Sequence, residues 1–564
     1  MKQTKKINFH KRFLLTSLFL IGCYWLSSMF AIRFDATSDK RYTLSAVTIE
    51  LLKKVDQPLV VQVLLDGNLT GEFGKLKTET IQLLDEMKAQ NSAIQIELVN
   101  PMDEKEAKNP FWQKQIQNGM LPVTLTINQK GQKTQEVVFP WALATYKDRT
   151  LKIPLLKNVM GAPTSEKINS SVQHLEYVFA STLSTLIRTK KQKVAVLKGN
   201  GEMADPYMAD FIKTVRESYF IGTFTLDSVA KKPIETRRVL QKYDLAVMVK
   251  PTEAFTDEEK QVLDQYILHG GKGLWMFDRV KMDLDSLYNT RTSHFALSQN
   301  LQLDDLLFKY GIRLAPRIVQ DLSVTPLVLA VGQQGSQTQY QQFPWMFSPL
   351  VFPDSTVNHP IVSHLDGVRM EFCSPIEVLN NGLQKTVLLR SSPLSRSLGT
   401  PCQVELSMVN ERPNQADFKN SGNMPLAVLL EGTFHSVYEN RILPFDDKQF
   451  SKQGDQGKLI VISDGDVIKN QFDKEYRPLE LGFDKWTNTL YGNKEFLMNC
   501  VNYLLGDTKL LALRNKEVAL AQLDPQSVSS QYYLSQMWAV GMPLLILGAI
   551  GGILLYLRKK RSYL

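Results

Sequence analysis

The two longest apolar runs in the chain lie near its ends, at residues 13–32 and 537–557. Neither run contains Asp, Glu, Lys or Arg. Each has the length of about 20 residues that a helix needs to cross the hydrocarbon of a bilayer. We therefore predict two transmembrane helices, with residues 33–536 forming the body between them. The second run also contains small residues that would let another transmembrane helix approach closely, namely Gly548, Gly551 and Gly552.

The first part of the body predicts a small α/β domain over residues 33–155. A buried strand at 58–67 precedes a helix at 76–90 and a second strand at 94–101. A further predicted helix, at 104–117, leads to two alternating strands.

These two strands are joined as a hairpin around Gly131. The resulting β-α-β-α-β-β order, with Pro122 just before the third strand, resembles the thioredoxin fold, in which that proline is cis. Thioredoxin-like enzymes place a C-x-x-C pair after the first strand, but residues 66–74 contain no cysteine. We expect a redox-inactive domain that serves as a scaffold or docking module.

Apolar residues at helical spacing predict a linker helix over 165–190, and alternating strand and helix patterns predict a doubly wound α/β domain over 191–515. The sheet of this domain resembles the class I glutamine amidotransferase-like fold. Residues 284–440 are less regular and contain β-like runs, which predicts a β-rich insertion.

One helix of this domain has clear start and stop signals. Thr256 and Glu259 have the spacing of a capping box, and Gly270 with Gly271 ends the helix. Lys272 therefore follows a helix and precedes a strand, which is the reverse of the order that a phosphate-binding P-loop requires.

The composition is that of packed globular material, with 43% hydrophobic and 22% charged residues. Basic clusters at 1–12 and 558–564 account for the net charge of +9, so the chain between them is neutral. A neutral body offers no net positive surface to a phosphate backbone, which argues against nucleic-acid binding. Basic residues outside both apolar runs predict an inner-membrane protein with both termini cytoplasmic and the body periplasmic.

The cysteines leave two points open. The sequence "LIGC" ending at Cys23 resembles the lipobox of bacterial lipoproteins, but the apolar run continues past Cys23, which favours an uncleaved anchor. Cys373, Cys402 and Cys500 lie in the body without C-x-x-C spacing. We expect buried thiols, with a bridge between Cys373 and Cys402 as the alternative.

The sequence contains no P-loop, no G-x-S-x-G elbow and no HExxH motif. Where amidotransferase-like folds place their nucleophile, residues 278–282 read "DRVKM", without cysteine, serine or glycine. We therefore expect a protein that is not an enzyme and has no cofactor and no metal site.

Three groups of residues stay open as ligand positions. Gly199 and Gly201 follow a strand, where they form either a weak dinucleotide signal or a tight turn. Asp464 and Asp466 also follow a strand, where they either hold a cation or cap a turn, and we favour the turn. His359 and His364, with Asp366 nearby, have a spacing that suits no single helical face, so we expect loop histidines.

The chain resembles the GldG family, the accessory membrane proteins of the ABC transporter associated with gliding motility in Bacteroidota. The resemblance is collinear over residues 41–515 and is carried by "RYTLSAVTIELLKKVDQPLVV", "YDLAVMVKPTEAFTDEEKQVLDQYILHGG", "FPWMFSPLV" followed by "HPI", "EGTFHSVYENR", and "VISDGD" with "NKEFLMNCVNYLLGD". It implies a separate ATPase subunit, a multi-span permease and a role in surface motility coupled to protein export. The family supplies no catalytic residues.

Three functions stay open at this point. The first is a non-catalytic transporter subunit whose body binds a substrate or partner, such as a secreted or envelope protein. The second is a cell-envelope enzyme with an unrecognised site in the amidotransferase-like sheet, which would need a nucleophile and a base together in a cleft. The third is a purely structural tether.

Overall fold

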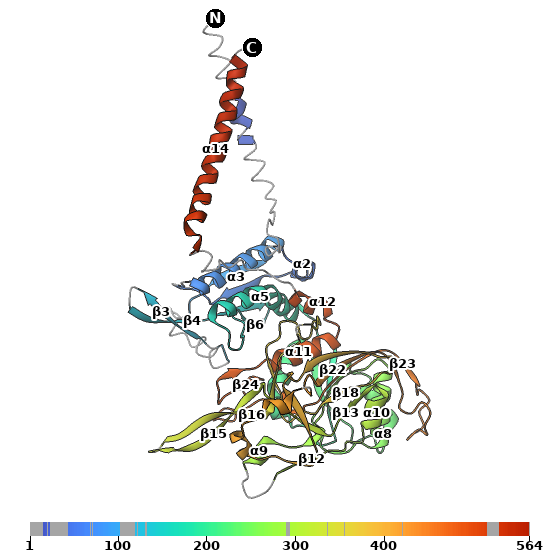
Figure 1. Cartoon of the computed structure of the whole chain (residues 1–564). Coiled ribbons are helices and arrows are strands. Elements are labelled where there is room, and N and C mark those ends of the chain that lie inside the picture. Colours follow the sequence, from blue (N-terminus) through green and yellow to red (C-terminus); the bar gives the residue numbers. More distant parts are fainter. Residues whose placement is uncertain are drawn as a thin grey trace. The chain divides into compact units, whose positions relative to one another are not determined.

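The computed structural model describes the chain except residues 1–14, 20, 23–42, 68, 70, 102–118, 121, 130–131, 289–293, 336, 355, 420, 516–529 and 563–564. The chain divides into two compact units, Met1–Lys516 and Glu517–Leu564 (Figure 1). The predicted helix at 104–117, Cys23 and the peptide bond before Pro122 lie outside the described residues.

The N-terminal part of the first unit is built on a four-stranded sheet of order β2-β1-β5-β6. Strands β1 (Leu59–Val63) and β2 (Ile94–Leu98) are parallel and are connected by helix α3 (Gly71–Gln90). The antiparallel hairpin of β5 (Trp141–Tyr146) and β6 (Arg149–Pro154) completes the sheet next to β1.

The predicted hairpin around Gly131 exists, but its place in the sheet was predicted wrongly. Strands β3 (Val123–Gln129) and β4 (Gln132–Val138) pair only with each other, as a separate two-stranded sheet. The sequence of β4 is mostly polar, whereas β5 carries the buried residues Ala142, Leu143 and Ala144. The buried strand therefore takes the position beside β1, because burial of apolar side chains is the main stabilising term.

Helix α5 (Thr164–Ile187) occupies the residues where the linker helix was predicted. Its buried face includes Ile168, Leu175, Phe179 and Leu183. It contacts α3 and β6 and also the short helices α2 (Ala46–Leu52) and α12 (Thr508–Leu511). Segments from both ends of the unit therefore pack on this one helix.

A seven-stranded sheet of order β19-β22-β23-β10-β9-β7-β8 forms the centre of the second part of this unit. Five of its strands are parallel: β7 (Lys193–Lys198), β8 (Phe220–Thr225), β9 (Leu245–Val249), β10 (Lys272–Met276) and β23 (Gln453–Ile462). If these five strands are numbered in chain order, they lie side by side in the sheet in the order 2-1-3-4-5, which is a common order of doubly wound sheets.

Both faces of this sheet are buried. Val194, Val247 and Leu274 belong to a hydrophobic cluster that also contains residues of α6 (Ala209–Ser218) and α11 (Asn493–Leu504). Their neighbours along the same strands belong to a second cluster that also contains residues of α8 (Asp257–Leu268) and α10 (Asp304–Lys309). Burial on both faces explains why these strands are continuous apolar runs.

The predicted β-rich insertion at 284–440 does not form one separate body. Strands β19 (Gln384–Arg390) and β22 (Pro425–His435) extend the main sheet antiparallel to β23. The apolar run Leu426–Leu430 is fully buried and has to lie in the core.

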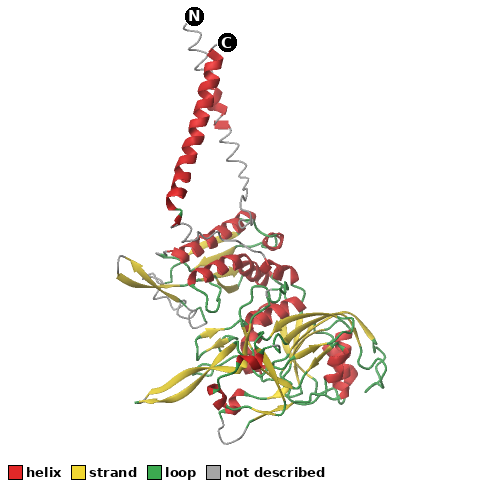
Figure 2. Cartoon of the chain, viewed as in Figure 1, coloured by secondary structure: helices red, strands yellow, loops and turns green. Residues whose placement is uncertain are grey.

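The rest of the 284–440 region forms small sheets, shown in Figure 2. They contain β11 (Val280–Lys281), β12 (Phe295–Ser298), β13 (Ile312–Leu314), β14 (Arg317–Asp321), β15 (Val324–Gln334), β16 (Gln337–Val351), β17 (Val368–Arg369), β18 (Ile376–Val378), β20 (Ser395–Gly399) and β21 (Cys402–Gln403).

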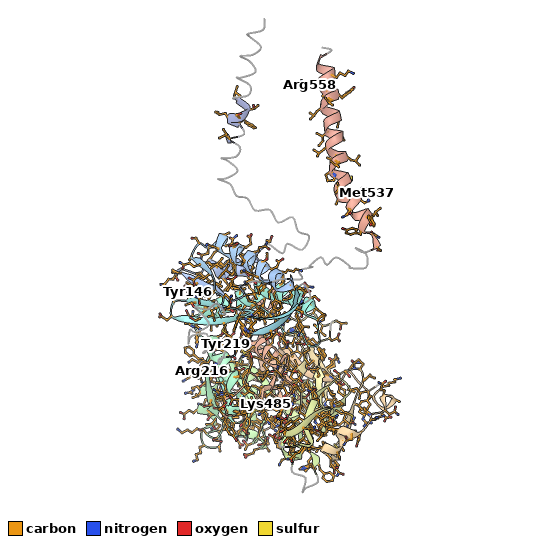
Figure 3. The ribbon with its side chains drawn as sticks, turned by 90° about the vertical axis from the view of Figure 1, so that its left-hand side faces the viewer. Tyr146, Arg216, Tyr219, Lys485, Met537 and Arg558 are labelled. Atoms are coloured by element: carbon orange, nitrogen blue, oxygen red, sulfur yellow. The ribbon has the colours of Figure 1, made fainter. Side chains whose placement is uncertain are left out.

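In the second unit, helix α14 (Tyr532–Ser562) contains one candidate membrane span, Tyr532–Lys559, in which an 18-residue window has a mean hydropathy of 2.2. Met537 and Arg558, labelled in Figure 3, lie near its two ends. Of the other predicted span, the structure describes residues 15–19 and 21–22, which are helical.

Candidate functional site

Three neighbouring parallel strands end in charged residues at the same edge of the main sheet. Lys250 follows β9 directly, Asp278 comes two residues after β10, and Asp464 comes two residues after β23. The last residues of the three strands are in register, since Met276 pairs with both Val249 and Ile462. Open α/β sheets bind ligands at this carboxyl edge, so we treat it as the candidate site.

The ammonium group of Lys250 lies among the carboxylates. Lys250 Nζ is 3.1 Å from Asp278 Oδ2 and also donates a hydrogen bond to Asp466 Oδ2. Asp278 Oδ1 accepts a hydrogen bond of 2.6 Å from the backbone N–H of Gly465. A Cβ atom on Gly465 would lie 2.5 Å from the Lys250 side chain, so only glycine fits between these groups.

Asp464 and Asp466 have different surroundings. Asp464 Oδ1 accepts from the N–H of Asp466 at 2.7 Å, and its Oδ2 accepts from the N–H of Glu371 at 2.8 Å. Asp464 therefore caps the turn after β23. Asp466 instead pairs with Lys250, and its Oδ1 is buried without a hydrogen-bond partner among the described residues.

Burial controls the ionisation of this cluster. Loss of hydration and the nearby Asp466 raise the pKa of Asp278 to about 6, against the opposing effect of Lys250. Burial also raises the pKa of Asp464, together with repulsion from Asp278, and raises the pKa of Asp466. Burial lowers the pKa of Lys250, but the attraction of Asp278 and Asp466 is stronger than this effect, so the pKa of Lys250 is raised overall. Lys250 therefore stays charged at neutral pH.

The carboxylates of Asp278, Asp464 and Asp466 have ligand atoms within 4.8 Å of one another, which is a donor set for a hard divalent cation. However, Lys250 Nζ already contacts two of the three groups. A metal ion would have to displace a buried ammonium group to bind there. The geometry therefore fits an internal ion pair in which lysine is the cation better than it fits a metal centre.

The structure does not bring Gly199 and Gly201 into an open ligand site. Gly201 has φ +71°, and a Cβ atom on it would lie 2.1 Å from Thr252 Oγ1. The N–H groups of Thr252 and Glu253 both donate to the carbonyl of Asn200 at 2.9 Å. The loop after β7 is therefore packed against the loop after β9, and a phosphate group would have no room between them.

The clustered histidines have backbone roles. His359 Nδ1 accepts from the N–H of Ile361 at 3.3 Å, and its ring lies 4.8 Å from that of Tyr503. The carbonyl of His364 accepts a hydrogen bond from Lys157, and Asp366 Oδ2 accepts from the N–H of Met160 at 3.2 Å. This segment therefore attaches the N-terminal part of the unit to the second part.

The alternative of a Cys373–Cys402 bridge was wrong. Both residues, and Cys500, are free thiols. Cys373 is fully buried in the core on one face of the main sheet, whereas Cys402 packs on a separate cluster around Trp345 and Phe347. Burial raises the pKa of the Cys373 thiol well above its ordinary value, so Cys373 is a poor nucleophile.

A second candidate is a cavity of about 620 Å³ with a strongly charged lining. Three ion pairs cross or border it: Arg279 with Asp304 at 2.9 Å, Lys309 with Glu439 at 3.0 Å, and Arg441 with Asp305 at 2.6 Å. The side chain of Phe308 is 61% exposed beside these pairs. Charged groups of both signs around one aromatic ring could hydrogen-bond to a polar ligand and pack against its apolar part.

Sequence reasoning missed Lys250, Asp278 and the cavity. Lys250 and Asp278 each follow an apolar strand, in the segments "YDLAVMVK" and "GLWMFD". The sequence does not show that these two strands are neighbours in the sheet, so it does not predict that the two side chains meet. The cavity joins residues near 279, 304–316 and 436–441, and its only sequence signal is that Glu439 and Arg441 lie in the segment "EGTFHSVYENR".

The body thus contains a doubly wound α/β sheet with an ion-paired carboxyl edge, and helix α14 is long and apolar enough to cross a membrane. The family model of an ABC-type uncharacterized transport system matches residues 191–500, and the chain belongs to this family. The protein is thus an auxiliary component of an ABC-type transport system, which associates it with transporter subunits and with the membrane. Residues 38–145 match a domain of unknown function.

The chain is also similar to an uncharacterized protein of Borreliella burgdorferi, with 20% identity over 562 residues that cover 97% of each chain. Among solved structures, the mmIFT52 N-terminal domain has 16% identity and a TM-score of 0.32, covering 56% of this chain and 98% of that chain. This TM-score is too low to support an argument about fold or function.

Proposed function

We propose that this protein is a non-catalytic subunit of an ABC transporter, whose body binds a partner or substrate while separate ATPase and permease subunits supply energy and the transport path. Membership of the auxiliary family supports the class. The absence of a P-loop from the sequence supports a separate ATPase.

The ion-paired sheet edge carries the non-catalytic part of this proposal. The carboxyl ends of β9, β10 and β23 are closed by Lys250, Asp278 and Asp466, and the neighbouring loop at Gly201 is packed against Thr252. Enzymes with doubly wound sheets bind their substrates at this edge. At this edge the charged side chains are engaged in a buried ion pair. They therefore do not form a nucleophile and a base that a substrate could reach from solvent.

The charged cavity supports a binding role over that of a simple tether. A spacer needs no concave surface, whereas the cavity presents charges of both signs and an exposed aromatic ring. Its ion pairs are already formed, so the cavity keeps its shape before a ligand arrives, which reduces the cost of binding. We propose that it receives a polar segment of the cargo or of a transporter subunit.

The finer parts of the proposal rest on the sequence. They are two transmembrane helices, cytoplasmic termini, a periplasmic body with thioredoxin-like and amidotransferase-like parts, and a GldG-like role in gliding motility and protein export. The four-stranded sheet in β2-β1-β5-β6 order and the 2-1-3-4-5 order of the parallel strands support the two fold resemblances.

The test separates membrane anchoring from the role of the body. In cells that lack the gene, the full-length chain is compared with a variant in which residues 43–515 are replaced by an inert soluble domain. We expect both to be recovered with the permease, but only the full-length chain to restore transport. Restoration by the variant without the body would contradict the proposal.

A second variant tests the cavity. Arg441→Glu removes the pair with Asp305 and reverses one lining charge, whereas Arg477→Glu changes an exposed arginine that lies outside the cavity lining. We expect only Arg441→Glu to reduce transport while leaving the recovery of the permease unchanged. Equal activity of the two variants would rule out the cavity as the binding surface.

A further inference from the structure

Strands β15 and β16 form a long hairpin whose outer half is exposed. Figure 1 shows the hairpin extending away from the rest of the first unit. Its base is fixed by the buried residues Trp345 and Phe347, which pack on Phe372. Residues 337–342, in contrast, are all exposed. We call residues 327–343 the arm.

The arm lies in the longest uncharged stretch of the body. No Asp, Glu, Lys, Arg or His occurs from Leu322 to Pro353, although 22% of the chain is charged. The arm instead contains six glutamines, at positions 333, 334, 337, 339, 341 and 342. Soluble proteins normally place charges, especially lysine, on exposed strand edges to prevent pairing with other strands. The arm lacks this protection.

The two edges of the arm are not equivalent. On β15, Val331 is an extra residue between Ala330 and Gly332, which pair with Tyr340 and Gln339, so this edge carries a bulge. A bulge disrupts the pattern of N–H and C=O groups that another strand would need. On β16, residues Gln337–Phe343 follow one another without a break.

No second strand among the described residues pairs with β16 over this regular segment. Its only other strand partner in the part of the chain that the structure describes is β17, which pairs at Leu350 and Val351. Pro344 has no N–H group and limits pairing at the base. The segment Gln337–Phe343 is therefore a template for one more strand.

Aromatic side chains mark the centre of this segment. Tyr340 is 58% exposed and Trp486 is 56% exposed, and their rings lie 5.7 Å apart. Lys485, labelled in Figure 3, lies 5.4 Å from the Trp486 ring. Exposed tyrosine and tryptophan are enriched at protein interfaces.

We propose that the outer edge of β16 pairs antiparallel with the same edge of a second copy of this chain, with Tyr340 at the two-fold axis. The charge pattern selects this occupant. A strand that carries charges would place them against neutral side chains with no opposite charge to pair with, whereas the arm is itself an exposed and uncharged strand. An isologous contact is also the commonest way in which identical chains associate.

The register follows from the midpoint of the open segment. With Tyr340 on the axis, all seven residues from Gln337 to Phe343 are paired: Tyr340 faces the partner's Tyr340, and Thr338 faces the partner's Gln342. Directly opposite residues have Cβ atoms about 4.5–5.5 Å apart. The two copies of Thr338 would be about 14 Å apart, since a strand rises about 3.4 Å per residue.

The test uses the full-length chain in membranes. We expect Tyr340→Cys to form a disulfide-linked dimer on mild oxidation, because the two-fold axis brings the thiols together. Thr338→Cys is the matched control on the same exposed strand, and should give no more dimer than the wild type. The wild type measures the background from the native cysteines.

Two results would overturn the proposal. One is equal dimer from Tyr340→Cys and Thr338→Cys, or none from either. The other is a disulfide between Tyr340→Cys and a different protein, which would make the strand partner another subunit. Neither result would bear on the transporter role of the body, which is tested separately.

A second measurement uses charge. Gln339→Lys with Gln341→Lys places two lysines on each edge, so like charges would face each other across the axis. We expect co-purification of two differently tagged copies to fall at least ten-fold, without a change in unfolding temperature, because both side chains are exposed. Undiminished co-purification would contradict pairing through this edge.

Discussion

Arg514 Nη1 lies 2.5 Å from Glu495 Oε1, and the Arg514 side chain is fully buried. Its Nε and Nη2 donate to the carbonyl of Ser363 at 3.0 and 2.7 Å, and its guanidinium lies over the ring of Tyr177 on α5. Arg514 belongs to η5 (Ala512–Asn515), close to the end of the first unit. One side chain therefore joins this end of the unit to α5 and α11.

Replacing Arg514 by methionine should destabilise the first unit strongly. The substitution removes the main counter-ion of Glu495, whose side chain is 29% exposed. Breaking a fully buried pair costs about 3–5 kcal/mol, which is the upper limit expected here. The unfolding temperature of the full-length chain in detergent measures the effect. Adding Glu495→Gln should recover part of the loss, because the uncompensated charge is then removed.

Arg477→Met is the control for this prediction. Arg477 pairs with Asp473 at 2.6 Å, but its side chain is 69% exposed, and such surface pairs contribute little to stability. If Arg514→Met melts at the same temperature as Arg477→Met, the assigned role of the buried pair is wrong.

The pH dependence of stability should contain a contribution from Asp278. Its pKa in the folded protein is about 6, against an ordinary value of 3.8, so between these values the folded state binds more protons than the unfolded state. Its contribution to the free energy of unfolding is therefore greatest below about pH 4 and is lost as the pH rises through about 6. The expected size is about 1–3 kcal/mol.

Comparison with Asp278→Asn isolates this contribution. The stability of the wild type relative to the variant should fall as the pH is raised from 4 to 7. Asp285→Asn, at an 82% exposed position near the same cluster, should show no such trend. A wild-type advantage that grows with pH would mean that attraction to Lys250 outweighs the effect of burial.

Gly201→Ala should destabilise the protein more than Gly270→Ala. Both glycines have positive φ, +71° and +89°, but only at Gly201 would the new Cβ meet another atom, Thr252 Oγ1 at 2.1 Å. Backbone strain costs about 1–2 kcal/mol at either position, and the steric conflict adds to it at Gly201. Equal unfolding temperatures would show that the loop after β7 is more open than its packing indicates.

The three cysteines of the body should all react as thiols. Alkylation under denaturing and non-reducing conditions should modify Cys373, Cys402 and Cys500, because all three are free. Under native conditions the half-buried Cys402 should react before the fully buried Cys373 and Cys500. Labelling of Cys500 alone after denaturation would reveal a bridge between the other two.

Local signals in the sequence were sufficient to predict several elements. The predicted capping box of Thr256 and Glu259 is present at the start of α8, and Gly270 has the positive φ typical of a residue that ends a helix. These features depend on residues three or four positions apart in the chain, so they are visible in the spacing of apolar and polar residues along the sequence.

Features that depend on distant contacts could not be predicted in the same way. Strand β22 was assigned to an insertion because nothing near it in the chain shows that it pairs with β23. The hairpin of β5 and β6 turns at Lys147, which has φ +54° without being glycine, so the usual turn signal is missing. The cluster around Lys250 required the order of three strands, which sequence periodicity does not contain.

The central claim is that the chain works as an auxiliary subunit of an ABC transporter, and co-purification from native membranes tests it most directly. The tagged full-length chain, extracted in mild detergent, should bring down an ATPase subunit with a P-loop and a multi-span permease in fixed proportion. Recovery of the intact chain with neither of these subunits would contradict the claim.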